Sequence, residues 1–232
     1  KEYIAGLRLG LVTDTQDITG TVLQENPVDV SREAVETALR RFLGPQEQIP
    51  PMYSAVKING QKLYELARKG KEVARRPRAI TIHALELVAV SGRDYTLRVR
   101  CSKGTYVRTL CHDLGAALGC GGCMSSLRRV RAGSFTIEQA VTMEQLLAFA
   151  AQNDPQDALM PVDALFAAYP PLIVTMQQAV RLKNGAQVKD RQFAPGTYRV
   201  FAEDGEFLLL GRVEDMTLSS IKSFFEVNTL GT

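Results

Sequence analysis

Residues able to do chemistry gather in the stretch from Cys101 to Gly119, which begins Cys-Ser-Lys-Gly-Thr-Tyr-Val-Arg. The pattern predicts a strand, a sharp turn at Gly104 and a helix capped by Thr105. Tyr106 and Arg108 then lie in the first helical turn beside free backbone N–H groups, where proteins commonly hold anions and reacting groups. An ordinary strand-turn-helix, with a core tyrosine and a solvated arginine, explains the same residues equally well.

Four expected strands supply the framework around this stretch. Residues 3–11 alternate loosely as a strand, residues 79–90 and 94–101 pair as a hairpin, and residues 124–134 form a further strand rich in arginine. In the second strand of the hairpin, Tyr95, Leu97 and Val99 face one way, whereas Arg98 and Arg100 face the other. One face or edge of the predicted sheet is therefore basic.

The remaining patterns predict an α+β chain with two domains. Capping boxes at residues 142–145 and 175–178 open two helices. A boundary near residues 169–171 separates two parts. Residues 1–168 are expected to form a mixed, largely antiparallel sheet flanked by helices, and residues 169–232 a small β-rich module.

A stretch that carries lysine and tyrosine, at about residues 45–80, interrupts this framework. Prolines bracket it, and its pattern is half loop and half short helix. Long irregular segments of this kind usually serve binding rather than core packing. We therefore expect it to leave the sheet and reach toward a ligand.

Positive charge is concentrated in the same part of the chain. Residues 50–131 hold 16 Lys and Arg against 5 Asp and Glu, although the net charge of the whole chain is only +3. Four tyrosines are interleaved with these cations: Tyr53, Tyr64, Tyr95 and Tyr106. Cations bind phosphates and rings stack on bases, so RNA or single-stranded DNA is the expected ligand. The alternative is that these charges are merely solvated.

Other kinds of site find little support. Four cysteines, Cys101, Cys111, Cys120 and Cys123, form no disulfide framework and fit a reducing compartment. With two histidines, a zinc site would need nearly every candidate ligand to converge. No phosphate loop, dinucleotide fingerprint or nucleophile elbow occurs, so no cofactor is expected. No apolar run reaches the length of a membrane span, which makes a cytoplasmic location the expectation.

Longer motifs extend the pattern over the whole chain. They are Tyr3 with Leu-Arg-Leu-Gly at 7–10, Thr-Asp-Thr-Gln-Asp at 13–17, Pro-Met-Tyr-Ser-Ala-Val-Lys at 51–57, Tyr-Glu-Leu-Ala-Arg-Lys-Gly at 64–70, the 101–108 run with Asp-Leu-Gly at 113–115, and Leu-Arg-Arg at 127–129. In order and spacing, the sequence resembles the bacterial TruB-type tRNA pseudouridine synthases. The resemblance implies isomerisation of the T-loop uridine at position 55 of tRNA, with a flipped base and without metal or organic cofactor.

The resemblance also implies roles for individual side chains of the catalytic domain. In the family, the tyrosine matching Tyr3 stacks on the base and is favoured for proton transfer, and the tyrosine matching Tyr106 lines the pocket. The arginine matching Arg108 pairs with a nucleophilic aspartate, and the leucine matching Leu127 is an apolar wall. The choice of general base between Tyr3 and Tyr106 stays open.

RNA contacts are expected from the resemblance as well. Residues 51–70, within the insertion at about 45–80, match a thumb segment that folds onto the T arm, and residues 169–232 resemble a PUA-like RNA-binding domain. The expected RNA-binding side chains are Tyr53, Ser54, Lys57, Lys62, Tyr64, Arg68, Arg100, Lys103, Arg128 and Arg129. The expected partner is the T arm and T loop of tRNA, bound by a monomer without membrane contact or an obligatory protein partner.

The sequence departs from the family in its nucleophile. The family's aspartate lies in a Leu-Asp-Pro motif upstream of the strand at Tyr3, and these 232 residues contain no such motif. Asp14, Asp17 and Asp113 match other family positions. We therefore expect an N-terminal part to be missing and this chain alone to be inactive. Two alternatives are a non-catalytic RNA-binding fragment and a dyskerin-type guide-RNA enzyme, the latter disfavoured because that relative lacks the thumb-like stretch.

Overall fold

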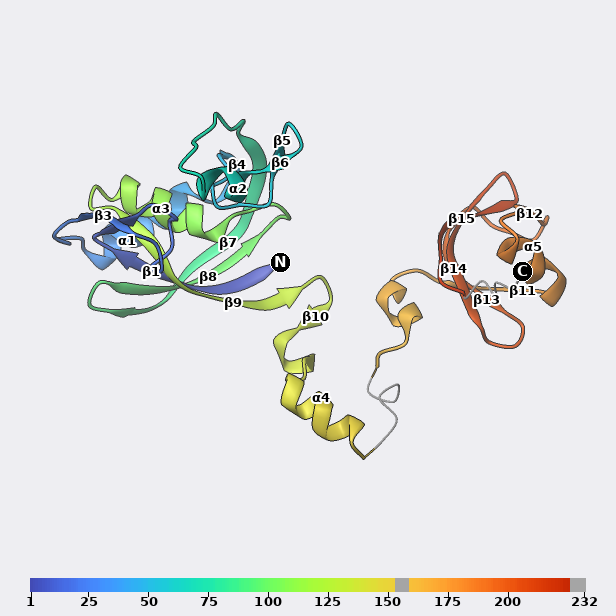
Figure 1. Ribbon diagram of the computed structural model, residues 1–232. Coiled ribbons are helices and arrows are strands. Elements are labelled where there is room, and N and C mark those ends of the chain that lie inside the picture. Colours follow the sequence, from blue (N-terminus) through green and yellow to red (C-terminus); the bar gives the residue numbers. More distant parts are fainter. Residues whose placement is uncertain (153–158, 226–232) are drawn as a thin grey trace. The chain divides into compact units, whose positions relative to one another are not determined.

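The computed structural model describes residues 1–152 and 159–225, and the chain divides into two compact units, residues 1–140 and 141–232 (Figure 1). The first unit is built on a six-stranded sheet with the strand order β10-β9-β1-β8-β7-β4, in which every neighbouring pair is antiparallel. Its strands are β1 (Glu2–Leu9), β4 (Gly44–Gln48), β7 (Arg78–Ser91), β8 (Asp94–Cys101), β9 (Gly122–Ala132) and β10 (Phe135–Thr136).

Shorter elements complete this unit. They are the pair β2 (Leu11–Thr13) and β3 (Val22–Glu25), the pair β5 (Lys57–Ile58) and β6 (Gln61–Lys62), the helices α1 (Arg32–Arg41), α2 (Leu63–Ala67) and α3 (Val107–Ala117), and the 3-10 turn η1 (Ile137–Gln139). Helices α1 and α3 bury their apolar residues with one face of the sheet. On β8 the alternation is as predicted, because Leu97 and Val99 are buried whereas Arg98 and Arg100 are exposed.

Strand β4 alters the limits of the expected insertion. Gly44–Gln48 pairs with the start of β7, with Gln48 opposite Arg78, so both ends of the 45–80 stretch belong to the sheet. The sequence did not predict this strand, because Gly-Pro-Gln-Glu-Gln is polar and contains a proline. Sheets accept proline mainly on edge strands, and β4 is an edge strand. The part that leaves the sheet is residues 49–77, which we call the 49–77 segment.

The second unit begins with α4 (Met143–Ala150) and η3 (Val162–Phe166), followed by a sheet with the strand order β11-β13-β14-β15-β12. The elements of its sheet region are β11 (Pro171–Val174), α5 (Met176–Lys183), β12 (Val188–Lys189), β13 (Gly196–Ala202), β14 (Phe207–Glu214) and β15 (Thr217–Ser223). Both predicted capping boxes are present, at α4 and α5, and β13 and β14 pair as an antiparallel hairpin. The proposed domain division after residue 168 falls between η3 and β11 and stays a prediction.

Two glycines allow α3 to lie directly on β9. A Cβ atom on Gly115 of α3 would lie 2.2 Å from the backbone nitrogen and 2.5 Å from the Cα atom of Gly122 on β9. Both obstacles are backbone, so a side chain cannot be accommodated by a rotamer change. The Asp-Leu-Gly motif at 113–115 therefore ends in glycine because the helix and the strand touch there.

Gly115→Ala is expected to lower the free energy of unfolding by roughly 3 kcal/mol, because the added methyl group forces the helix away from the strand. Thermal unfolding of this variant, beside Ala116→Ser at an exposed position of the same helix, measures the effect. Equal melting temperatures for the two variants would contradict the close packing described above.

Candidate functional site

Tyr3, Leu127 and Arg129 lie together on neighbouring strands. Tyr3 of β1 is opposite Val99 of β8 on one side and opposite Arg129 of β9 on the other. Two residues further along β1, Ala5 is opposite Leu127. Since side chains two residues apart share one face of a strand, Tyr3, Leu127 and Arg129 belong to the face that α1 and α3 cover. Leu127 is nevertheless 46% exposed, so this end of the face is open.

The environment of Tyr3 keeps its phenol neutral. Burial raises the pKa of the Tyr3 hydroxyl and the neighbouring Cys101 raises it further, whereas the guanidinium of Arg129 acts in the opposite direction. A tyrosine with a raised pKa is protonated at neutral pH, so it can donate a hydrogen bond. The site thus combines an aromatic ring, a neutral hydroxyl group and an adjacent cation.

Tyr106 lies at the N-cap position of α3 and is held by Gln48. The helix begins at Val107, and no side chain caps it. The predicted cap, Thr105, is wrong, because its hydroxyl donates to the carbonyl of Ser102 at 3.1 Å instead. The backbone N–H of Tyr106 donates to Oε1 of the buried Gln48 at 2.8 Å, and Nε2 of Gln48 donates to the Tyr106 carbonyl at 3.1 Å.

A second contact fixes the first turn of α3 to the loop after β2. The buried hydroxyl of Thr109 donates to Oε1 of Gln16 at 2.8 Å. Gln16 lies at φ +62°, and its carbonyl accepts the N–H of Met124 at 3.0 Å. In the same loop, Asp14 and Asp17 accept backbone N–H groups, from Thr21 at 2.8 Å and from Thr19 at 3.0 Å, so both carboxylates hold the turn.

Arg108 occupies the first turn of α3 and is half-buried. Within residues 1–152 and 159–225, its guanidinium makes no hydrogen bond or ion pair. A guanidinium group offers five donors in a fork that matches a carboxylate or a phosphate. Within the described residues, the first turn of α3 therefore presents a cation with free donors.

The expected RNA-binding residues of the 49–77 segment are only partly accessible. Leu63 anchors the segment because it is fully buried. Lys62 and Arg68 both lie over the ring of Tyr64, at 5.4 and 5.3 Å from its centroid, so cations and an aromatic face are combined there. Ser54 is 6% exposed, so its side chain faces the inside of the segment.

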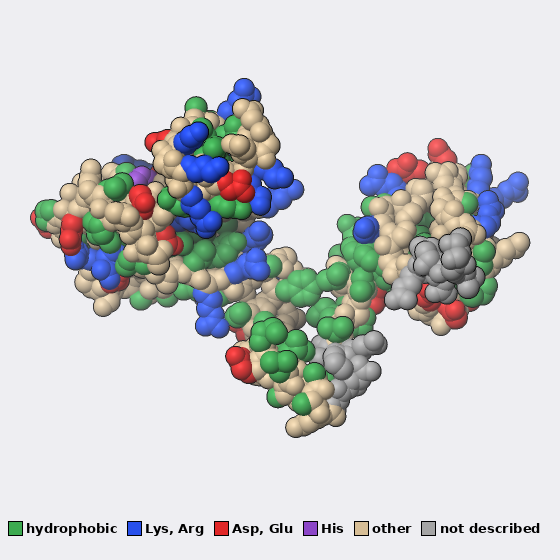
Figure 2. Space-filling view, in the orientation of Figure 1, with side chains coloured by type: hydrophobic (Ala, Val, Ile, Leu, Met, Phe, Trp, Pro, Cys, Tyr) green, Lys and Arg blue, Asp and Glu red, His purple; other side chains and the backbone are tan. Residues whose placement is uncertain are grey.

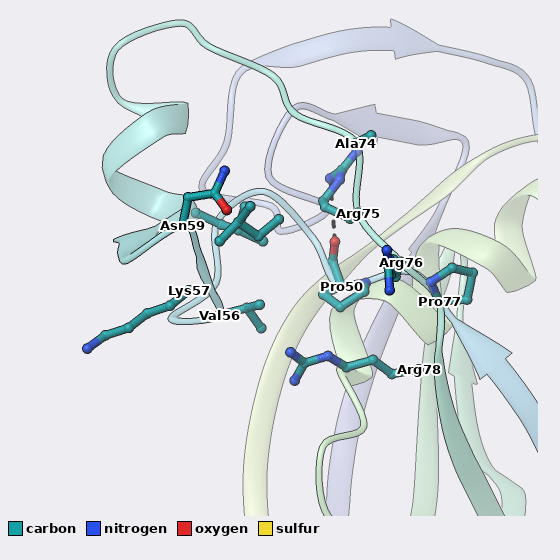
Figure 3. Close-up of a pocket in the computed structure, with 11 residues that line it drawn as sticks. Pro50, Val56, Lys57, Asn59, Ala74, Arg75, Arg76, Pro77 and Arg78 are labelled. Carbon is teal, nitrogen blue, oxygen red and sulfur yellow. Dashed lines mark hydrogen bonds between the residues drawn. The ribbon is translucent and has the colours of Figure 1, made fainter.

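A cavity of about 530 Å³ opens between the 49–77 segment and the start of β7 (Figure 3). Four basic side chains line it, Lys57, Arg75, Arg76 and Arg78, and none of the lining residues is acidic. In Figure 3, Arg78 extends toward the opening whereas the ammonium group of Lys57 points away from it; Arg75 donates to the Pro50 carbonyl at 3.4 Å. The sequence motifs include none of these three arginines, although the basic run Arg-Arg-Pro-Arg at 75–78 is a signal for them.

A second cavity, of about 410 Å³, lies between the 49–77 segment and the loop after β2. Its lining includes Tyr53, Gln16, Arg75 and His112. Tyr53 therefore faces the loop that also positions α3. The second cavity therefore brings Tyr53 and Arg75 of the 49–77 segment together with His112 of α3.

The remaining expected contacts lie elsewhere on the sheet. Arg128 is opposite Ile4, and Arg100 is opposite Glu2, so both lie on the face away from Tyr3 and Arg129. On that face Arg98 also forms an ion pair with Glu2 at 2.8 Å. Lys103 is exposed in the turn after β8. The structure thus separates Arg100 and Arg128 from the Tyr3 site and leaves Arg129 beside it.

Charge differs between the two units. Residues 1–140 hold 21 Lys and Arg against 14 Asp and Glu, whereas residues 141–232 hold 7 against 11. Figure 2 shows basic side chains gathered on the first unit, over the part that carries β5, β6 and α2. The concentration of positive charge predicted from the sequence therefore lies in the first unit. No helix in the described part of the chain is long and apolar enough to cross a membrane.

Burial raises the pKa of the Asp113 carboxyl group, and the neighbouring His112 acts in the opposite direction. A carboxyl group whose pKa is higher in the folded than in the unfolded chain favours folding when protonated, and that contribution is lost as the pH rises through the folded pKa. Ionised Asp113 therefore lowers stability at neutral pH.

Asp113→Asn is accordingly expected to raise the melting temperature at pH 7 by about 2 °C. The gain should disappear below about pH 4, where the carboxyl group is protonated in both states. Thermal unfolding from pH 3.5 to 7.5, with the exposed Asp29→Asn as control, measures it. A gain that is independent of pH would show that the charge of Asp113 is not its cause.

Comparison with known proteins gives consistent matches. Residues 1–107 match the family described as TruB family pseudouridylate synthase (N terminal domain), and residues 108–167 match the tRNA pseudouridylate synthase B C-terminal domain. A tRNA pseudouridine synthase B of Azoarcus sp. is 47% identical over 219 residues, which are 94% of this chain and 72% of the relative. The protein of the same name from Clostridium kluyveri is 38% identical, over 97% of this chain and 78% of the relative.

Solved structures that superpose on this chain belong to complexes that contain Cbf5 or an H/ACA RNP. A crystal structure of a Cbf5-Nop10-Gar1 complex superposes with a TM-score of 0.66 at 23% identity, and this chain spans 66% of that chain. An H/ACA RNP bound to a substrate RNA containing 2'-deoxyuridine superposes with a TM-score of 0.64 at 20% identity. At these identities the likeness shows the fold alone, and it supports the predicted α+β class.

Proposed function

The chain belongs to the TruB family of pseudouridylate synthases, and we propose that it isomerises the T-loop uridine at position 55 of tRNA to pseudouridine. It is a tRNA-modifying isomerase, as its relatives are named. The observation that carries the finer proposal is the grouping of Tyr3, Leu127 and Arg129 at the open end of the sheet face that α3 covers. An aromatic ring, an apolar wall and a cation suit a flipped base with its phosphate.

The ring of Tyr3 is proposed to stack on the flipped uracil. A base taken out of its stack loses several kcal/mol of stacking energy, and a ring in the pocket restores part of it. The neutral hydroxyl of Tyr3 can donate a hydrogen bond or transfer a proton within the site. Tyr106 and Leu127 are proposed to line the same pocket, and the choice of general base between Tyr3 and Tyr106 stays open.

The nucleophile is proposed to be the aspartate of the family's Leu-Asp-Pro motif, which these 232 residues do not contain. Asp14 and Asp17 are held in hydrogen bonds of a turn, which supports leaving them out of the chemistry. Arg108 has free donors, so it is proposed to pair with that aspartate. The pair would lower the pKa of the aspartate and hold it as an anion aimed at the flipped nucleotide.

The T arm is proposed to bind along the first unit. The cations around Tyr64 and the arginines of the cavity at the start of β7 can neutralise backbone phosphates, which position RNA without selecting its sequence. Lys57, Lys103 and Arg129 are proposed to extend this path, with Tyr53 and Ser54 close to it. Arg100 and Arg128 are proposed to contact the RNA on the face of the sheet opposite to Tyr3.

We further propose that the protein acts as a monomer on tRNA in the cytoplasm, without a guide RNA. The 49–77 segment supports this proposal, because its cations and the ring of Tyr64 can bind the T arm directly, without a guide RNA that pairs with the substrate. Residues 169–232 are proposed as a PUA-like RNA-binding domain. In the described part of that region, the parallel pair β11–β13 and three antiparallel pairs make up the sheet.

Single-turnover conversion of uridine in a T-arm stem-loop tests the proposal. The chain preceded by an N-terminal segment that carries the Leu-Asp-Pro motif should convert the uridine without added guide RNA, and the 232 residues alone should not. In the longer form, Arg108→Lys should slow conversion by at least about tenfold, because a point charge cannot replace the fork that orients a carboxylate through two hydrogen bonds.

Arg40→Lys is the matched control, since Arg40 is exposed on α1 and its guanidinium donates to the hydroxyl of Thr37. Conversion by the 232 residues alone would refute the assignment of the nucleophile. Unchanged rates for Arg108→Lys would remove Arg108 from the mechanism, and a requirement for guide RNA would favour the dyskerin-type alternative.

A further inference from the structure

One buried side chain connects the 49–77 segment with the first turn of α3. Gln48 is the last residue of β4, so the chain leaves the sheet directly after it and returns at Arg78, its partner in the strand pair. The side chain of Gln48 crosses to Tyr106, 58 residues further along the chain. Gln48 is only 5% exposed. A polar side chain at this depth needs its hydrogen bonds satisfied, and Tyr106 supplies both partners.

The side-chain amide of Gln48 forms two hydrogen bonds with the Tyr106 backbone, one as acceptor and one as donor, as the backbone of a neighbouring β-strand does. It accepts the Tyr106 N–H at 2.8 Å and donates to the Tyr106 carbonyl at 3.1 Å. The Tyr106 backbone is correspondingly extended, with φ −99° and ψ 105°. The same carbonyl also accepts the N–H of Leu110 at 3.1 Å, so the position of Gln48 is tied to the first turn of α3.

We propose that Gln48 is a positioning residue for the isomerisation. Its amide fixes the backbone of Tyr106 and thereby the direction in which α3 presents Tyr106 and Arg108. The next residues, Ile49 and Pro50, begin the 49–77 segment, so this segment leaves the sheet directly after the residue that holds the first turn of α3. This inference rests on the proposed function for the roles of Tyr106 and Arg108, and the buried Gln48 acts through Tyr106.

A consequence is that Gln48 affects the chemical step more than RNA binding. The cations that can neutralise phosphates lie on the 49–77 segment and at the start of β7, and the side-chain amide of Gln48 bonds to the Tyr106 backbone rather than to their side chains. Loss of the amide contact leaves those cations in place. It frees the Tyr106 backbone, so the productive arrangement of the pocket is populated less often.

Two variants separate the two hydrogen bonds. Gln48→Glu keeps the size and the acceptor but turns a negative oxygen toward the Tyr106 carbonyl. Gln48→Met keeps the approximate volume and removes both bonds, which leaves the Tyr106 N–H without its partner. Gln46→Glu is the matched control: Gln46 lies on the same strand, and its Nε2 donates to the carbonyl of Phe42 rather than to a residue of α3.

In the form that carries the Leu-Asp-Pro motif, both Gln48 variants should lower the single-turnover rate at saturating RNA by at least about tenfold. The dissociation constant for a T-arm stem-loop should stay within about twofold, and Gln46→Glu should match the unchanged protein in both. An unchanged rate would overturn the proposal, as would a loss of affinity equal to the loss of rate.

Hydrogen exchange of the Tyr106 amide, followed by NMR in the 232-residue chain without RNA, tests the contact independently of activity. Gln48→Met should speed exchange at Tyr106 by about tenfold while amides of β1 and β8 keep their rates. Unchanged exchange at Tyr106 would overturn the proposal. If the form that carries the Leu-Asp-Pro motif and no substitution converts no uridine, the proposed function fails, and the exchange measurement still decides whether Gln48 holds Tyr106.

Discussion

The placement of β1 between β8 and β9 is the constraint on which the site depends. Because all three strands pair in fixed register, the alternation of side chains brings Tyr3, Leu127 and Arg129 to one face and sends Arg100 and Arg128 to the other. A shift of one residue would exchange these two groups. The buried row of Ala5, Leu7 and Leu9 on β1 excludes such a shift, since it would expose that row to water.

Helix α3 completes the site because three contacts fix it on this sheet. Gly115 lets the middle of the helix touch β9, Gln48 holds the residue before its first turn, and Gln16 holds Thr109 one turn later. Each contact reaches a different part of the chain. The first turn of α3, with Arg108, is thus determined by the edge strand, the central strands and the loop after β2 together.

Much of this arrangement could be predicted from the sequence, because the signals are local. The alternation of β8, the hairpin with β7 and the capping boxes at Thr142 and Thr175 need only neighbouring residues. Strand β4 and the role of Gln48 could not, since a polar edge strand carries no apolar alternation and its partner lies far along the chain. Local patterns also contain no information on residues far along the chain. For this reason the sequence predicted Thr105 as the cap of α3, whereas the residue that holds the start of the helix is Gln48.

The proposed roles of individual site residues come from the family resemblance and not from local sequence patterns. The structure adds to the motifs by showing on which face of the sheet each residue lies. Leu-Arg-Arg at 127–129 is one motif, yet Arg128 and Arg129 lie on opposite faces of β9. The cavity lined by Lys57, Arg75, Arg76 and Arg78 likewise brings a lysine of the 51–57 motif together with three arginines that no motif contains.

Photocrosslinking from the substrate base tests the central claim most directly, namely that the base at position 55 lies against Tyr3. A T-arm stem-loop with 4-thiouridine at position 55 is irradiated in complex with the protein, and the modified peptide is identified by mass spectrometry. The account predicts crosslinks to the peptide that contains Tyr3, lost with a stem-loop that carries the label in its stem. Crosslinks confined to residues 159–225, or to the face of Arg100 and Arg128, would contradict it.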